Sequence, residues 1–166
     1  MKQPNEEERE RQLREVALNL MRKDRGYFGT FPIDVLISWL EDRNETDHRV
    51  LCAYCDLPLL DDNLNSFNGT ADHLLPQKTY PELDFNKANG NSVACCSRCN
   101  WLKAAWDPNT KGSDPIYDAA RDKGKLDKDK RKLLINRARA YVQGKLKIKH
   151  TAWEHWVAAC KTLSEI

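Results

Sequence analysis

Two pairs of cysteines constrain the fold of this chain more than any other feature of its sequence. Cys52 and Cys55 form one CxxC motif, and Cys96 and Cys99 form a second about forty residues later. Each pair can turn tightly around one ion, and two such pairs supply the four thiolates of a tetrahedral structural zinc site. Because a four-thiolate site has no open position for water, we expect zinc to stabilise the centre of the chain and not to do chemistry.

Two further cysteines, Cys95 and Cys160, need a separate interpretation. Cys95 competes with Cys96 for the third ligand position, but it lies one residue too far from Cys99 to form the same tight turn. The spacing therefore favours Cys96. Cys160 falls on the apolar stripe of a C-terminal helix, where a thiol usually behaves as a small buried hydrophobe.

The length and composition predict one compact unit outside the membrane. The chain has 166 residues, of which 40% are hydrophobic and 31% charged. It contains no apolar run of the roughly 18 residues that a membrane span requires. The N-terminal residues lack the basic start and apolar stretch of a secretory signal, so we expect a cytoplasmic protein.

Positive charge is concentrated in one segment. Residues 121–150 contain 12 Lys and Arg but 3 Asp and Glu, a net charge of +9, whereas the whole chain has a net charge of +2. Such a segment can neutralise phosphates, although a helix with one charged face can equally be a solvated surface. The candidate nucleic-acid contacts in or near it are Lys130, Arg131, Lys132, Arg137 and Arg139.

Helical patterns flank an irregular centre. Asn5 is placed as the N-cap of an amphipathic helix that should end at Gly26, and a second helix should begin near Pro32. Near the other end, a basic helix is expected to end at about Gly144, and a capping box at Thr151 should start a last helix. The tryptophans of these helices, Trp39, Trp153 and Trp156, fall on apolar stripes and are expected to lie in the core.

The centre also carries a polar pair, Asp72-His73, between the two CxxC motifs. A lone His beside an Asp is more often structural than catalytic. Two asparagines change this interpretation. Asn91 precedes a short apolar stretch, and Asn100 follows Cys99 directly.

The order CxxC, Asp-His-x-x-Pro, Asn, CxxC-Asn-x-x-Lys resembles the HNH endonucleases of the ββα-metal, or His-Me finger, superfamily in their zinc-stapled form. The resemblance covers about residues 50–106. It implies an α+β fold in which a treble-clef-like ββα-metal centre is flanked by helices. The corresponding division is a helical extension over residues 1–49, a core over 50–108, and basic and amphipathic helices over 109–166.

The resemblance also implies roles for single residues. His73 matches the general base, Asp72 a metal-binding acid, Asn91 the middle letter of the motif and Asn100 the third, where the name-giving pattern has His. Family products would be a 5′-phosphate and a 3′-hydroxyl. Arg98 and Lys103, around the expected helix, are candidates for phosphate contacts or for ordinary surface charges.

The residue types suit this chemistry. Phosphodiester hydrolysis needs an activated water and a cation that neutralises developing charge. An imidazole with an unperturbed pKa near 6.5 can accept the proton, and Asp72 and Asn100 supply hard oxygens that suit Mg²⁺ or Mn²⁺. Asn91 is expected to orient His73 or to brace its loop.

The leading hypothesis is therefore a small endonuclease that acts on DNA, with RNA not excluded, in restriction, phage defence, phage packaging or mobile-element biology in a bacterial or phage-infected cell. One alternative is a noncatalytic zinc-finger module that binds nucleic acid. Another is a nuclease subunit whose target is chosen by a partner protein, since nothing in the sequence resembles a recognition helix or another base-reading element. The chain could also form a homodimer.

Overall fold

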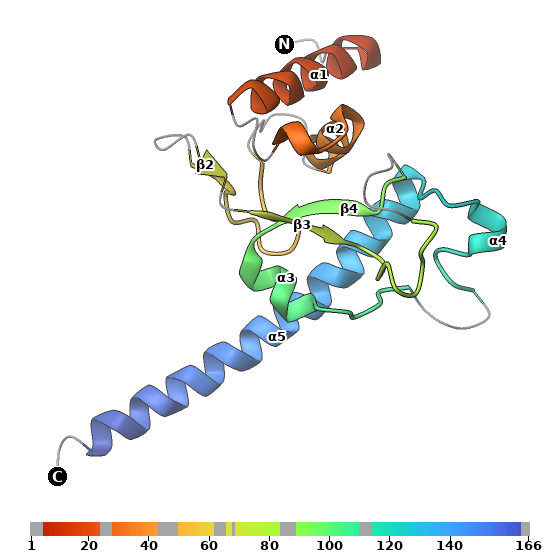
Figure 1. The fold of residues 1–166 in the computed structure, drawn as a ribbon. Helices are drawn as coiled ribbons and strands as arrows, with labels where there is room; N and C mark the ends of the chain where they lie inside the picture. Colours follow the sequence, from red (N-terminus) through yellow and green to blue (C-terminus); the bar gives the residue numbers. More distant parts are fainter. Residues whose placement is uncertain are drawn as a thin grey trace.

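A computed structural model of the chain describes residues 5–23, 28–42, 50–61, 66–67, 69–83, 89–109 and 114–163. Along these residues helices come first, short strands follow, and further helices complete the chain (Figure 1). In chain order the elements are α1 (Glu6–Lys23), the 3₁₀ helix η1 (Phe28–Thr30), α2 (Ile33–Glu41), β1 (Leu60–Asp61), β2 (Ser66–Phe67), β3 (Thr70–His73), β4 (Ser92–Cys95), α3 (Ser97–Lys103), α4 (Ala119–Asp122) and α5 (Lys128–Leu163). Among the described residues, no helix is both long and apolar enough to cross a membrane.

The centre of the molecule is an antiparallel pair of strands followed by a helix. Strand β3 pairs with β4 in a register that sets Thr70 opposite Cys95 and His73 opposite Ser92. Strand β4 is buried along its whole length, and after Cys96 the chain enters α3. Strands β1 and β2 form a separate two-stranded ribbon. The mixed helical and sheet architecture confirms the α+β prediction.

The two N-terminal helices lie together on one side of this centre (Figure 1). The predicted cap of α1 is confirmed, because the side-chain oxygen of Asn5 accepts a hydrogen bond of 2.8 Å from the Glu8 backbone N–H. Helix α2 lies against β4, where the Trp39 indole donates a hydrogen bond of 3.2 Å to the Ser92 hydroxyl. Trp39 is a core residue, as expected. The predicted helix end at Gly26 lies outside the described residues.

The prediction of two C-terminal helices is wrong, because α5 is one continuous helix of 36 residues. Gly144 does not end it. A glycine in a helix interior costs only about 1 kcal/mol relative to alanine, and the surrounding residues are good helix formers. Thr151 does not act as a cap either, because its hydroxyl donates to the Lys147 carbonyl oxygen of the preceding turn at 3.1 Å.

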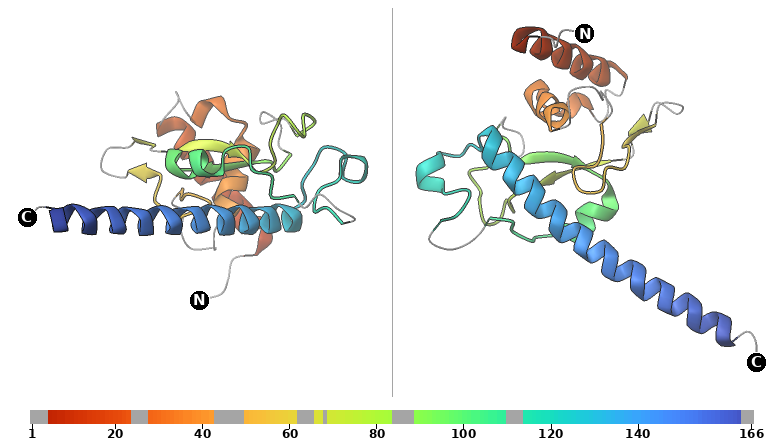
Figure 2. Two further views of the ribbon diagram at one scale, coloured as in Figure 1. Left: turned by 90° about the horizontal axis from the view of Figure 1, so that it is seen from below. Right: turned by 180° about the vertical axis from the view of Figure 1, so that it is seen from behind.

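The first half of α5 packs in the core, and the second half projects away from the rest of the molecule (Figures 1 and 2). Leu134, Ala138 and Val142 are fully buried in the first half. In the projecting half, Ile148 is 71% exposed and Trp153 is 59% exposed. The expectation that Trp153 lies in the core is therefore wrong. The side chains of Trp156 and Cys160 lie outside the described residues.

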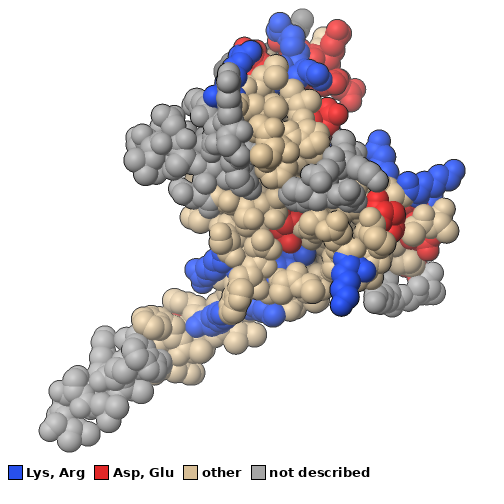
Figure 3. Space-filling model, viewed as in Figure 1, with Lys and Arg blue, Asp and Glu red and all other residues tan. Residues whose placement is uncertain are grey.

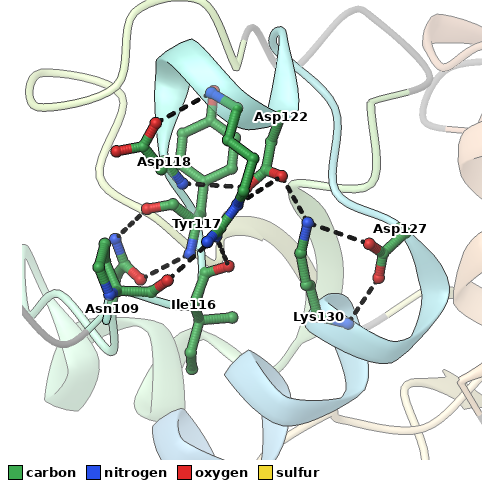
Figure 4. Close-up of polar contacts among 9 residues, drawn as sticks. Asn109, Ile116, Tyr117, Asp118, Asp122, Asp127 and Lys130 are labelled. Carbon is green, nitrogen blue, oxygen red and sulfur yellow. Dashed lines mark hydrogen bonds and ion pairs between the residues drawn. The ribbon is translucent and has the colours of Figure 1, made fainter. Parts of the chain in front are cut away.

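The segment before α5 is held by a network of polar contacts (Figure 4). The side-chain amide of Asn109 donates to the Tyr117 carbonyl oxygen and accepts from the Tyr117 backbone N–H, both at 2.8 Å. The Lys130 ammonium lies 2.5 Å from a carboxylate oxygen of Asp122 and 3.2 Å from one of Asp127. These contacts fix the α4 segment onto the start of α5.

Buried residues from all three predicted segments belong to one hydrophobic core. Phe28 and Leu36 come from the N-terminal extension, Leu74 and Val93 from the centre, and Leu134 from the C-terminal segment. The flanking helices therefore belong to the same packed unit as the strands. Three of the four CxxC cysteines, Cys52, Cys96 and Cys99, belong to this core.

Candidate metal centre and hairpin site

The four cysteines of the two CxxC motifs come together as predicted. The sulfur atoms of Cys52, Cys55, Cys96 and Cys99 all lie within 4.8 Å of one another, and the sulfurs of Cys55 and Cys96 are 3.9 Å apart. Four thiolates around zinc at about 2.3 Å stand roughly 3.8 Å from each other in a tetrahedron. The donor atoms and their spacing therefore fit a structural zinc ion.

Backbone geometry holds the first cysteine pair in a tight turn. The Cys52 N–H donates to the Leu57 carbonyl oxygen at 2.8 Å, and Asp56 adopts a positive φ of 62° that lets the chain reverse. The Ala53 N–H donates to the Ala94 carbonyl oxygen at 2.9 Å. This bond ties the turn to β4, and so brings the first pair beside the second.

The second cysteine pair is positioned by the start of α3. Cys96 is the N-cap residue of α3, and its carbonyl oxygen accepts the first helical hydrogen bond, from Asn100, at 3.0 Å. Cys99 lies one turn into the helix and is buried. The prediction that Cys96 and not Cys95 joins the cluster is confirmed, because Cys95 ends β4 and lies outside the set.

The electrostatics of the cluster favour a bound cation. Burial raises the pKa of the Cys52 thiol to about 11, and burial together with the neighbouring Cys52 raises the pKa of Cys99 strongly. Burial also acts to raise the pKa of Cys96, but hydrogen bonds from Cys99 and the other cysteines outweigh it and lower that pKa. Four adjacent thiols cannot all ionise without a compensating charge, and a divalent metal ion supplies that charge.

Asp72 lies in a buried polar contact that the sequence analysis did not anticipate. Its Oδ2 atom accepts a hydrogen bond of 2.6 Å from the Tyr54 hydroxyl and lies 3.2 Å from the Lys103 ammonium. Burial, and then the Asp72 charge, raise the Tyr54 pKa well above its usual value, so the phenol stays a donor. Tyr54 stands inside the first CxxC motif, and this position beside a ligand is the only sequence signal that pointed to it.

Lys103 is buried and forms an ion pair with Asp72. Its side chain is 1% exposed, and its ammonium also donates to the His73 carbonyl oxygen at 2.6 Å. In this position Lys103 does not reach the protein surface, so the structure removes it from the cations that can meet a phosphate. It connects the end of α3 to the end of β3.

His73 is the last residue of β3, and its side chain is half-buried with the Nε2 atom enclosed by protein. Backbone hydrogen bonds of the β3–β4 pair fix the position of His73. The next residue, Leu74, donates its N–H to the Asn91 carbonyl oxygen at 2.8 Å, which continues the strand pairing beyond His73. His73 therefore sits where the hairpin opens into a loop.

Asn91 braces that loop. Its side-chain oxygen accepts from the Leu75 N–H at 2.8 Å, and its amide nitrogen donates to the carbonyl oxygens of Leu75 at 3.1 Å and Leu83 at 3.2 Å. The Asn91 side chain is completely buried. Of the two roles expected for Asn91, these contacts correspond to bracing the loop that follows His73.

Asn100 lies in the middle of α3 and is half-buried. It precedes Lys103 by three residues, a spacing that places both side chains on adjacent parts of one helix face. Helix α3 packs against β3 and α5. The side chains of Asp72 and Asn100 therefore come from two elements in contact.

Some of the Lys and Arg residues predicted to contact nucleic acid form ion pairs within the protein, and others are exposed. Arg131 is buried and pairs with Asp42 at 2.5 Å, which removes it from the surface. Lys130 is held by Asp122 and Asp127, and the Arg139 guanidinium donates to Asp56 at 3.0 Å and to the Ala53 carbonyl oxygen at 3.0 Å. Arg98 and Lys132 are exposed, and the exposed Arg137 donates to the Pro108 carbonyl oxygen at 3.5 Å.

Comparison of the chain with protein-family models, with curated proteins and with solved structures found no match.

Proposed function

We propose that this chain is a metal-dependent endonuclease of the HNH type that hydrolyses phosphodiester bonds in DNA. The observation that supports the proposal is the placement of His73 at the loop end of the β3–β4 pair, where Lys103 at the end of α3 contacts it. The motif residue Asn91 braces the loop after His73, and the motif residue Asn100 lies on the helix that packs against β3. The order of elements is strand, strand and helix, as the ββα-metal fold requires.

In this proposal His73 is the general base. An imidazole can take a proton from water near neutral pH because its unperturbed pKa is about 6.5. Lys103 and Asn91 hold the backbone that follows the imidazole, through the His73 carbonyl oxygen and the Leu75 N–H. These contacts fix the backbone that carries the imidazole, and general-base catalysis needs the base in a defined place.

Asp72 and Asn100 would hold the Mg²⁺ or Mn²⁺ ion. When bound, the ion would neutralise charge that develops on the phosphate and the leaving oxygen. Both contacts of Asp72 described above are made by Oδ2, so Oδ1 is the atom assigned to the metal. Because the Lys103 ammonium already stands beside this carboxylate, it should repel a second cation and make metal binding weak.

The test is cleavage of supercoiled plasmid by the wild type and by His73→Ala, each with EDTA, Mg²⁺, Mn²⁺ or Ni²⁺. Metal-dependent nicking or linearisation by the wild type that disappears in His73→Ala is the expected result. A matched control is His150→Ala, which removes an exposed imidazole that pairs with Glu154 on the projecting part of α5 and should cut normally. Zinc content and circular dichroism should be unchanged in both variants. Equal cleavage by His73→Ala and the wild type would overturn the role of His73.

The second candidate is a noncatalytic zinc-stabilised module that binds nucleic acid. It is favoured by the Lys103–Asp72 ion pair, because a carboxylate neutralised by a protein ammonium has less need of a metal ion. The same experiment separates the two functions. Absence of cleavage with every metal, together with one zinc per chain and retained binding to DNA, favours the module.

A further inference from the structure

Aromatic and basic side chains meet on the surface where α3 lies beside α5. We call them the α3–α5 strip, which consists of Trp101, Trp106, Tyr141, Lys145 and Lys149. Figure 3 shows Lys and Arg atoms gathered around the place where α3 meets α5 in Figure 1. The strip uses none of the residues that form the metal centre or the Asp72–Lys103 contact.

The strip is ordered by ring contacts. Trp106 and Tyr141 stack face to face with centroids 4.1 Å apart and an interplanar angle of 5°. The Lys145 ammonium lies 4.6 Å from the centre of the Tyr141 ring, and the Lys149 ammonium lies 3.8 Å from that of Trp101. Tyr141, Lys145 and Lys149 follow at four-residue spacing on one helix face, about 6 Å apart along the axis. Rings and positive charges thus alternate along the surface.

Trp106 and Tyr141 are half-buried against the core, whereas Trp101 and Lys149 are exposed. Trp101 is 68% exposed, although a tryptophan side chain carries a large apolar area that proteins usually bury. The next residue, Leu102, is buried. Within the part of the chain that the structure describes, no ion pair with a carboxylate neutralises Lys145 or Lys149. Lys130 and Arg131, by contrast, are held by aspartates. The strip therefore combines an exposed ring with two lysines that no described carboxylate neutralises.

We propose that the α3–α5 strip binds a single-stranded segment of DNA, with bases stacked on Trp101 and phosphates on Lys145 and Lys149. Proteins that bind single strands combine aromatic faces with a positive track, because an unpaired base offers a free ring face and each nucleotide carries a negative charge. A duplex hides its base faces inside the helix, so it cannot use Trp101 in this way. The charge and the rings together favour a nucleic acid over a protein partner.

The location gives the strip a role in the proposed reaction. Trp101 follows Asn100, the residue assigned to the metal, so a strand on the strip would run close to Asn100. This part of the inference rests on the proposed endonuclease function. The preferred substrate is then DNA with an unpaired strand near the cut, such as a flap, a bubble or a melted region.

The experiment measures binding without cleavage, in EDTA at low salt. A fluorescently labelled oligo(dT) of about 20 nucleotides and a duplex of the same length are titrated with the full-length, zinc-loaded chain, and anisotropy is recorded. The variants are Trp101→Leu, which keeps apolar bulk but removes the ring, and Trp101→Phe, which restores a ring. Lys149→Gln is paired with Lys125→Gln, which removes an exposed charge outside the strip.

The wild type should bind oligo(dT) more tightly than the duplex. Trp101→Leu should weaken oligo(dT) binding roughly tenfold, and Trp101→Phe should recover most of the loss. Lys149→Gln should weaken binding and lower the salt dependence of log K by about 0.7, whereas Lys125→Gln should bind as the wild type. Trp101→Leu binding equal to the wild type, or a duplex bound as tightly as oligo(dT), would overturn the inference.

The two proposals fail separately. Strip-dependent binding of oligo(dT) without cleavage of any DNA contradicts the endonuclease and leaves the strip assignment in place. Plasmid cleavage that depends on His73, with oligo(dT) binding indifferent to Trp101, contradicts the strip and leaves the endonuclease in place. Because Trp101 is largely exposed, its substitution should not change zinc content or the unfolding temperature.

Discussion

The ammonium of Lys103 lies 3.2 Å from the carboxylate of Asp72, and the two side chains are 1% and 9% exposed. The pair joins α3 to β3 from inside the core. Tyr54, from the first cysteine turn, donates its hydroxyl to the same carboxylate oxygen. One buried oxygen therefore connects the hairpin, the helix and the metal-binding turn.

Breaking this pair from one side should be strongly destabilising. Among the described residues, Lys103→Met leaves the buried Asp72 charge with Tyr54 as its remaining partner. Removal of one member of a buried ion pair typically costs about 3–5 kcal/mol. The double variant Lys103→Met/Asp72→Asn removes both charges, so it should be more stable than the single variant. Urea unfolding measures both differences. A double variant less stable than Lys103→Met would show that the two residues do not act as a pair.

Zinc binding should depend on Cys96 and not on its neighbour. Cys96→Ala removes one of four clustered thiolates, so the purified chain should lose most of its zinc and unfold at a much lower temperature. Cys95→Ala removes an adjacent buried thiol outside the cluster and should keep one zinc per chain. Elemental analysis and thermal unfolding test both variants. Loss of zinc from Cys95→Ala with retention in Cys96→Ala would reverse the ligand assignment.

Asn91 and Asn109 are both buried, and the side chain of each forms hydrogen bonds with backbone groups of other segments. Each makes three side-chain hydrogen bonds, and substitution by alanine should cost about 3 kcal/mol in either case because backbone groups lose their partners. Only Asn91 braces the loop beside His73. Below the unfolding temperature, Asn91→Ala should therefore reduce plasmid cleavage about tenfold or more, while Asn109→Ala cuts as the wild type. Equal cleavage by the two variants would count against a positioning role for Asn91.

Asp122 should contribute to acid sensitivity. Its burial acts to raise the pKa, but hydrogen bonds from Arg121 and Lys130 outweigh this and hold the pKa well below the usual range (Figure 4). A lowered folded-state pKa contributes stability at neutral pH that is lost as the pH falls below about 4, where the unfolded carboxylate takes up its proton first.

Asp122→Asn should therefore be less stable than the wild type at pH 7, and its stability should fall less between pH 5 and pH 2. Asp114→Asn, at an exposed carboxylate, should follow the wild-type profile. Urea unfolding at a series of pH values measures the profiles. An Asp122→Asn curve parallel to that of the wild type would refute the assignment.

Gly144 should be replaceable with a gain in stability. It lies inside α5 with a φ outside the left-handed region, and an added Cβ would meet no atom within 4 Å. Gly144→Ala should stabilise the chain by about 0.5–1 kcal/mol, which corresponds to a rise of roughly 1–4 °C in Tm. Thermal unfolding checks this. A lower Tm would mean that the helix needs a flexible residue at this position.

The local sequence rules predicted those parts of the structure that depend on neighbouring residues. The cap at Asn5, the start of α2 after Pro32 and the grouping of Cys52, Cys55, Cys96 and Cys99 are set by spacing along the chain, and all three are present. The α+β class was implied by the resemblance to the HNH endonucleases, and the structure shows it.

The features that sequence reasoning missed depend on contacts between distant segments. Nothing in the sequence around Lys103 distinguishes a buried ammonium from a surface one, because its burial is set by Asp72, thirty-one residues away. Arg131 is likewise turned inward by Asp42. The predicted helix end at Gly144 is wrong because a single glycine or threonine weakens a helix only slightly and does not stop it.

Because α5 is continuous, its second half projects from the molecule as one straight helix (Figure 1). From Leu146, the last residue described as packing on the core, the helix continues to Leu163, an unbroken length of about 25 Å. A rigid rod of that length converts each degree of tilt at its base into about 0.4 Å of travel at its tip. Lys149 lies on this rod and reaches back to Trp101 on α3. The base of the projecting helix is therefore joined, through Lys149 and Trp101, to the helix that carries Cys99 and Asn100.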